Sequence, residues 1–105
     1  MSREKTEDEV RKEFLEMVRA DIHFWKNTKL DYEAFPNESD LERRLNGLAF
    51  SILVILDGES MIPGFKVIPD PHSDDKQYCI DNNEDWYPDD VDISGCLHEQ
   101  LHAHK

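Results

Sequence analysis

Glycine-rich loops, cysteine clusters and long apolar runs are all scarce in this chain of 105 residues. Its four glycines form no G-x-G arrangement, so the sequence offers no glycine-rich loop for a nucleotide phosphate. The longest apolar run, residues 48–56, includes Ser51 and is far shorter than the ~20 residues that a membrane-spanning helix needs. No apolar run follows the charged N-terminus, so we expect no secretory signal. The two cysteines, Cys79 and Cys96, are expected to be free thiols in a reducing cytoplasm.

Basic residues are also few, because 12 lysines and arginines stand against 24 aspartates and glutamates, giving a net charge of −12. The excess lies in residues 31–105, and residues 70–92 contain nine acids and a single base, Lys76. Such a segment repels phosphates and anionic lipids, so nucleic-acid and membrane binding are disfavoured. Its potential attracts a basic protein or cations. The alternative interpretation is that acidity only keeps a small domain soluble.

The length predicts a single domain, 1–105. Apolar residues make up 38% of the chain and aromatic residues 10%, which allows a modest packed core without a metal or a disulfide. Residues 1–6 precede the first helical pattern and are expected to be disordered.

A long N-terminal helix is the clearest element of the sequence. Residues 6–9 form a capping box, in which the Thr6 hydroxyl accepts from the amide of Glu9 and the Glu9 side chain returns the bond. Apolar side chains then recur at three- and four-residue intervals. This pattern predicts a helix from about residue 7 to residue 27.

A second helix is predicted after another capping box at residues 39–42. Its apolar phase continues from Leu41 to Leu56, and Gly58 then tolerates the left-handed backbone that ends many helices. The β-branched residues within 50–56 also suit a strand. The unbroken phase and the signals at both ends favour the helix.

The remaining third of the chain is divided by prolines and glycines, and predicts shorter elements. Residues 65–68 and 77–80 are strand-like and suggest a hairpin with a long loop. Asp92 is a candidate cap for a last helix from Ile93, with Leu97 and Leu101 on its inner face. The predicted fold is therefore α+β, with two packed amphipathic helices, a small antiparallel β-hairpin or irregular β segment, and a short C-terminal helix.

The last helix contains an H-E-x-x-H pattern, the strongest chemical motif of the chain. It places His98 and His102 one turn apart with Glu99 beside them, the arrangement of zinc hydrolases in which the glutamate is the general base. Such a site needs a third protein ligand, and Asp70, His72 and Asp74 are candidates that no spacing singles out. Histidines near a helix C-terminus also interact well with the helix dipole. A metal is therefore not required to explain them, and we expect none.

A second metal hypothesis concerns calcium. Asp81, Asn83 and Asp85 occupy positions 1, 3 and 5 of an EF-hand-like spacing, which continues with acids at positions 9 and 12. Trp86 stands at position 6, where the turn of that motif requires glycine. The competing interpretation is a solvated turn that holds Trp86.

The chain resembles a small bacterial family of uncharacterised proteins from about residue 40 to the end, on residues 43–51, 57–58, 71–75, 83–88 and 92–99. The resemblance implies a cytoplasmic α+β domain without an assigned activity, and no functional residue is transferred from it. We expect a non-enzymatic acidic binding or accessory protein with a basic protein as partner. Inhibition of the immunity or antitoxin kind is one concrete form of this function. A small zinc-dependent hydrolase and a calcium-binding module are the alternatives.

Overall fold

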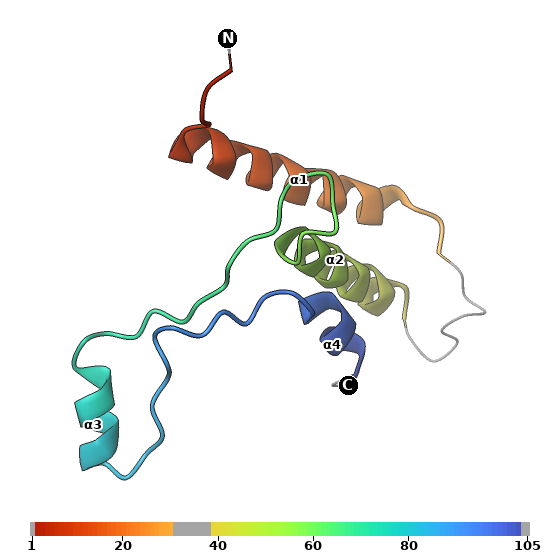
Figure 1. Cartoon of the computed structure of the whole chain (residues 1–105). Coiled ribbons are helices and arrows are strands. Elements are labelled where there is room, and N and C mark those ends of the chain that lie inside the picture. The colour runs from red at the N-terminus through yellow and green to blue at the C-terminus, as the bar shows by residue number, and fades with distance from the viewer. Residues whose placement is uncertain (1, 31–38, 104–105) are drawn as a thin grey trace.

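Four α-helices make up the regular structure of the residues that the computed structural model describes, which are 2–30 and 39–103 without the side chains of 102 and 103. The helix bounds are α1 Glu7–Asn27, α2 Asp40–Leu56, α3 Asp75–Asp81 and α4 Leu97–Ala103. Helix α2 packs against α1 on one side and α4 on the other (Figure 1). Across the same residues, α3 packs against no other helix. None of the described helices is both long and apolar enough to cross a membrane.

The first helix has the predicted bounds. The Thr6 hydroxyl accepts from the Glu9 amide, and Glu9 Oε1 accepts from the Thr6 amide, so both bonds of the capping box are present. At the other end, Nη1 of Arg44 donates to the backbone carbonyls of Trp25 and Thr28. Arginine from α2 thus satisfies carbonyls that the last turn of α1 leaves without helical partners.

The second helix is also confirmed, and the alternative strand over residues 50–56 is wrong. The Ser39 hydroxyl caps the amide of Glu42 at the start of α2. Gly58 has φ +83° at the end, where only glycine adopts this backbone without strain. A side chain there would also meet the backbone of Gly64 at 3.0 Å, because the chain turns back closely at this point.

The core between these helices is small. Ile55 of α2 is the one apolar side chain that is fully buried among the described residues, with 2% exposure. The Trp25 ring lies directly over Gly47, and its Nε1 donates to the Ser51 hydroxyl at 2.8 Å. Farther along α1, Phe14 meets Phe65 edge to face. Aromatic side chains of α1 thus pack both against α2 and against the segment that follows it.

The predicted α+β class is wrong for the described residues, which are helical and contain no strand. Residues 65–68 are extended without a sheet partner, and residues 77–80 lie inside α3. Strand propensity largely measures packing against neighbouring strands. Tyr78 and Ile80 have no such neighbours here and are exposed, so their side-chain type does not determine the local structure.

The C-terminal helix begins at Leu97, four residues after the predicted start. Asp92 does not cap it, because its Oδ1 accepts from the backbone amides of Val67 and Ser94. Gly95 has φ +112°, which is not a helical conformation. The predicted inner position of Leu101 is also wrong, since this side chain is 38% exposed.

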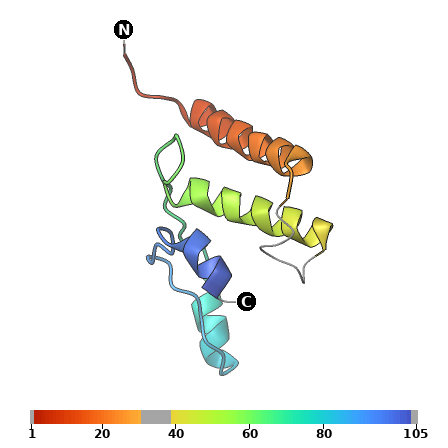
Figure 2. The ribbon, with the colours of Figure 1, turned by 90° about the vertical axis from the view of Figure 1, so that its right-hand side faces the viewer.

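Residues 66–94 form a projection that we call the acidic arm. Its two limbs leave the helical layers side by side, with α3 at the far end (Figures 1 and 2). The Ile93 amide donates to the Val67 carbonyl at 2.8 Å and joins the limbs near their base. The arm makes the molecule open: its radius of gyration is 18.1 Å, against about 13 Å for a compact chain of this length.

Candidate functional site

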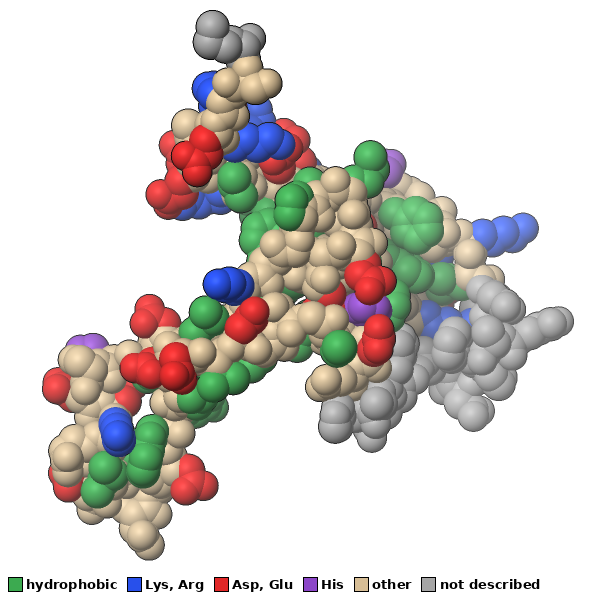
Figure 3. Space-filling view, viewed as in Figure 1, with side chains coloured by type: hydrophobic (Ala, Val, Ile, Leu, Met, Phe, Trp, Pro, Cys, Tyr) green, Lys and Arg blue, Asp and Glu red, His purple; other side chains and the backbone are tan. Residues whose placement is uncertain are grey.

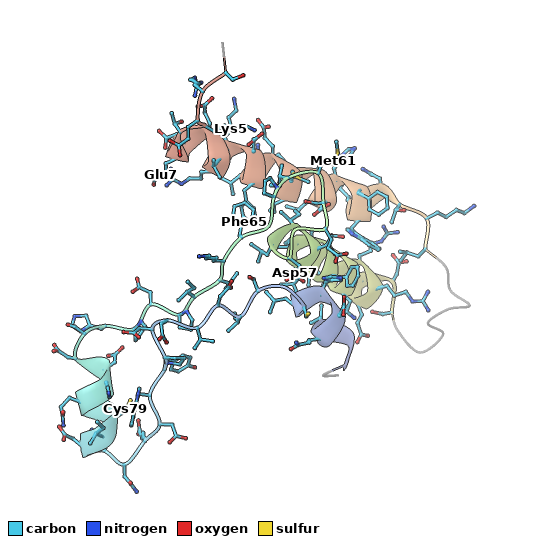
Figure 4. All side chains as sticks on the ribbon, in the orientation of Figure 1. Lys5, Glu7, Asp57, Met61, Phe65 and Cys79 are labelled. Carbon is cyan, nitrogen blue, oxygen red and sulfur yellow. The ribbon has the colours of Figure 1, made fainter. Side chains whose placement is uncertain are left out.

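The most strongly polarised group of side chains lies where α2 ends and α4 begins. Asp57 follows the last residue of α2 (Figure 4), and its side chain is fully buried. Its Oδ1 accepts from the Gly95 amide at 2.8 Å, and its Oδ2 accepts from the His98 amide at 2.9 Å. The Nδ1 of His98 lies 2.6 Å from the same Oδ2. One carboxylate therefore caps the start of α4 and holds the imidazole.

The charges of this pair reinforce each other. Burial alone raises the pKa of Asp57, but the hydrogen bonds from His98 and Gly95 outweigh it and lower the pKa to about 2. The hydrogen bond to Asp57 raises the pKa of His98 above its usual value, against the opposing effect of burial. Asp57 is therefore ionised at neutral pH, and Nδ1 of His98 is the donor in the bond between them.

The His98 ring is enclosed on its other sides as well. Its side chain is only 10% exposed, and the Phe50 ring meets it edge to face at 5.4 Å. Since Nδ1 is bound to Asp57, the nitrogen that remains is Nε2, which lies 3.8 Å from Oε1 of Glu99. One ligand atom each of Glu59, His98 and Glu99 lie within 4.8 Å of one another. We call these three residues the Glu–His–Glu cluster.

The H-E-x-x-H residues are only partly explained by this arrangement. His98 and Glu99 belong to the cluster, but His98 is buried rather than at the helix rim. The side chain of His102 lies outside the described part of the chain. The suggested third ligands, Asp70, His72 and Asp74, belong to the acidic arm and are not part of the cluster. Zinc binding through His98 and His102, with Glu99 as general base, stays an untested alternative.

The candidate calcium ligands lie at the end of α3 and in the segment after it. Asp81 ends α3 and its Oδ1 accepts from Gln77, while Asn83 follows in a turn with φ +57°. Among the described residues, neither Asp81 nor Asp85 belongs to a group of three or more neighbouring His, Cys, Asp or Glu side chains. Calcium binding by Asp81, Asn83 and Asp85 also stays an untested alternative.

Near the tip of the acidic arm, Trp86 packs beside α3. The Lys76 ammonium lies 5.2 Å from the centre of its ring, a cation–π contact. A shallow pocket at this place is lined by Pro71, His72, Lys76, Trp86, Tyr87, Pro88 and Asp89. The Trp86 side chain is nevertheless 46% exposed and that of Tyr87 74%.

Exposed apolar side chains continue along the arm and onto α1 and α2. On the arm they are Ile68, Tyr78, Ile80, Trp86, Tyr87, Val91 and Ile93. On the helices they include Leu15, Ile22, Phe24, Leu41 and Leu45. In Figure 3 apolar and acidic side chains both lie along the face of the arm that is in view.

Two residues of the site were missed by sequence reasoning, Asp57 and Glu59. Asp57 was interpreted only as part of a helix stop, because its partners lie 38 and 41 residues away. Glu59 follows two residues later, with nothing in its spacing that links it to His98.

Comparisons with protein-family models, curated proteins and solved structures gave no match for this chain.

Proposed function

We propose that this protein is a non-enzymatic binding protein whose acidic arm docks onto a basic protein. The observation that carries the proposal is the arm itself, which stands apart from the helical layers. It presents large apolar side chains among many carboxylates. Exposed aromatic residues such as Trp86 and Tyr87 are typical anchors of protein interfaces. An immunity protein or antitoxin that masks a basic protein is one form of this function.

The large accessible surface area of the chain supports the proposal that a partner covers part of it. It measures 8,735 Å², whereas a compact monomer of this mass exposes about 6,100 Å². The difference of about 2,600 Å² is larger than the ~800 Å² that each partner contributes to a standard interface. A chain that exposes this much surface gains stability when another protein covers the apolar part.

Charge decides which kind of partner fits. Residues 70–92 hold nine acids and one lysine, Lys76, and none of the four described helices carries a net positive charge. Two copies of a chain with net charge −12 repel each other, so the arm is poorly suited to pairing with itself. A basic surface with an apolar groove complements both features and steers association.

The test uses the full chain as bait for quantitative co-purification from its own cells, followed by size measurement of the recovered complex. We expect one partner of basic isoelectric point in a fixed ratio, with recovery that falls as salt rises. The double variant Trp86→Ala/Tyr87→Ala should no longer recover this partner. Met61→Ala, another highly exposed apolar side chain but outside the arm, serves as the control and should retain it.

Three outcomes contradict the proposal. These are an acidic partner, undiminished binding by the Trp86→Ala/Tyr87→Ala variant, and a stable homo-oligomer that the purified chain forms through the arm. Retained helicity in circular dichroism shows that a variant has not simply unfolded.

A further inference from the structure

The Glu–His–Glu cluster has properties that neither helix packing nor the proposed partner requires. Its histidine side chain is nine-tenths buried, and its Nε2 has no hydrogen bond within the described part of the chain. The two carboxylates come from different segments, Glu59 from the turn after α2 and Glu99 from the first turn of α4. Neither carboxylate is engaged in a hydrogen bond among these residues.

We propose that Glu59, His98 and Glu99 form a site for one zinc ion, with Asp57 as the residue that orients the imidazole. Imidazole nitrogen and carboxylate oxygen are ligands that Zn²⁺ accepts, whereas Mg²⁺ and Ca²⁺ prefer oxygen alone. Three protein ligands leave a fourth tetrahedral position for water. The site thus differs from the H-E-x-x-H interpretation, because Glu59 takes the place assigned to His102 and Glu99 is a ligand.

The distances suit this ion. Zinc bonds to nitrogen and oxygen are about 2.0–2.2 Å long, so tetrahedral ligand atoms lie about 3.3–3.6 Å apart. The Nε2 of His98 and Oε1 of Glu99 are 3.8 Å apart, and the full set lies within 4.8 Å. Closing these gaps requires small rotations of two exposed glutamate side chains, and no movement of the buried ring.

The hydrogen bond between Asp57 and His98 supplies what zinc-binding histidines usually have. A ligating imidazole commonly donates its other N–H to a carboxylate, which fixes the ring orientation and leaves the second nitrogen directed at the metal. Here Nδ1 donates to Asp57, and Nε2 faces the glutamates. The Phe50 ring restrains the imidazole further. The histidine is therefore held for coordination before any ion arrives.

Titration calorimetry of the full-length, chelator-treated chain with zinc chloride tests the site. We expect one Zn²⁺ per chain, and binding weaker by about tenfold or more in both Glu59→Gln and Glu99→Gln, since even outer-shell changes cost about 10–100-fold. Glu84→Gln, an exposed glutamate in the acidic arm, is the matched control and should bind as the wild type does. Magnesium and calcium chloride at the same concentrations should not displace zinc from this site.

A second measurement separates the cluster from the terminal histidines. Nuclear magnetic resonance of the imidazole nitrogens should show zinc on Nε2 of His98. The proposal is overturned if no stoichiometric binding occurs, if Glu59→Gln binds zinc unchanged, or if His102→Ala abolishes binding while Glu59→Gln does not. Because all measurements use the isolated chain, their outcome is independent of the proposed protein partner.

Discussion

Asp57 links three parts of the chain through a single side chain. It ends α2, accepts the amides of Gly95 and His98 at the start of α4, and binds the His98 ring. A buried donor that loses its acceptor costs about 1–3 kcal/mol. The packing of α4 against α2 therefore depends in part on this carboxylate.

Changing Asp57 to Asn should lower the free energy of unfolding by about 2–3 kcal/mol. The amide group of Asn has one oxygen and one NH₂, so at least one of the N–H donors now faces another donor. Urea denaturation of the metal-free chain measures the loss. Asp74→Asn, an exposed aspartate, is the control and should change stability by less than about 0.5 kcal/mol. Equal stability of Asp57→Asn and wild type would contradict the role of the carboxylate.

The same pair predicts a pH dependence. The folded pKa of Asp57 is depressed to about 2, so its stabilisation is present above the unfolded value of about 3.9 and is lost as the pH falls through about 2. The folded pKa of His98 is raised, so its stabilisation is complete below about 6.5 and is lost as the pH rises through the folded value. Glu59 and Glu99 also face this imidazole and favour its charged form.

The stability difference between wild type and Asp57→Asn should accordingly be largest between about pH 4 and pH 6.5 and shrink on both sides. Urea denaturation at a series of pH values in the presence of a chelator measures it. A difference that stays constant from pH 3 to pH 9 would show that the pair is not ionic in the folded state.

Gly47 lies within α2, and its lack of a side chain has a role in the packing of α1 against α2. A Cβ atom there would lie 2.5 Å from the Trp25 ring, so the α1–α2 interface requires its absence. Gly47→Ala should destabilise the protein by about 1–3 kcal/mol, the usual cost of overpacking, although alanine is the better helix former by about 1 kcal/mol. Asn46→Ala, one position earlier and exposed, should be neutral or stabilising. Thermal unfolding distinguishes them, and a stabilised Gly47→Ala would contradict the close contact.

The helices differ in how much of them is visible in the sequence. Helices α1 and α2 have local signals, a cap at the start and apolar residues in helical phase, and both have the predicted bounds. Helix α3 has neither a side-chain cap nor an apolar face, so the side-chain types of residues 77–80 suggested a strand. The start of α4 was misplaced because Asp92 is bound to Val67, 25 residues earlier. His98 and Glu99 were singled out because they belong to a local motif. Asp57 and Glu59 were not, because they meet this motif only through contacts that are distant along the chain.

The end of α1 depends on an arginine from the next helix. Arg44 donates to the carbonyls of Trp25, Lys26 and Thr28 through Nη1, and its Nε donates to Asp40. Since hydrogen bonds from a charged donor contribute about 1.5–3 kcal/mol in total at such a site, Arg44→Met should destabilise the protein by this amount. The amides in the last turn of α1 should then exchange hydrogen faster.

The control is Arg11→Met, since Arg11 makes only exposed ion pairs with Glu7 and Asp8 on α1. Its effect should remain below about 1 kcal/mol. If the two variants lose equal stability, the contacts of Arg44 with the α1 carbonyls do not matter more than surface ion pairs.

The molecule as a whole consists of two parts that depend little on each other. Helices α1, α2 and α4 form layers, whereas α3 packs against none of them among the described residues (Figure 1). The limbs of the acidic arm are joined near their base by Val67, Asp92 and Ile93. The proposed partner binding rests on this arm, which adds exposed surface but few contacts.

Replacing residues 70–90 by a short Gly/Ser loop tests this division. The change keeps the bonds between the limbs, so the free energy of unfolding of the remaining chain should change by less than about 1 kcal/mol, since only exposed contacts are removed. Zinc titration should be unaffected, because Glu59, His98 and Glu99 are retained, whereas the basic partner should be lost. Small-angle scattering should show a radius of gyration well below 18.1 Å. A shortened chain that unfolds would mean that the arm stabilises the helices, and its exposed apolar side chains would then need another explanation.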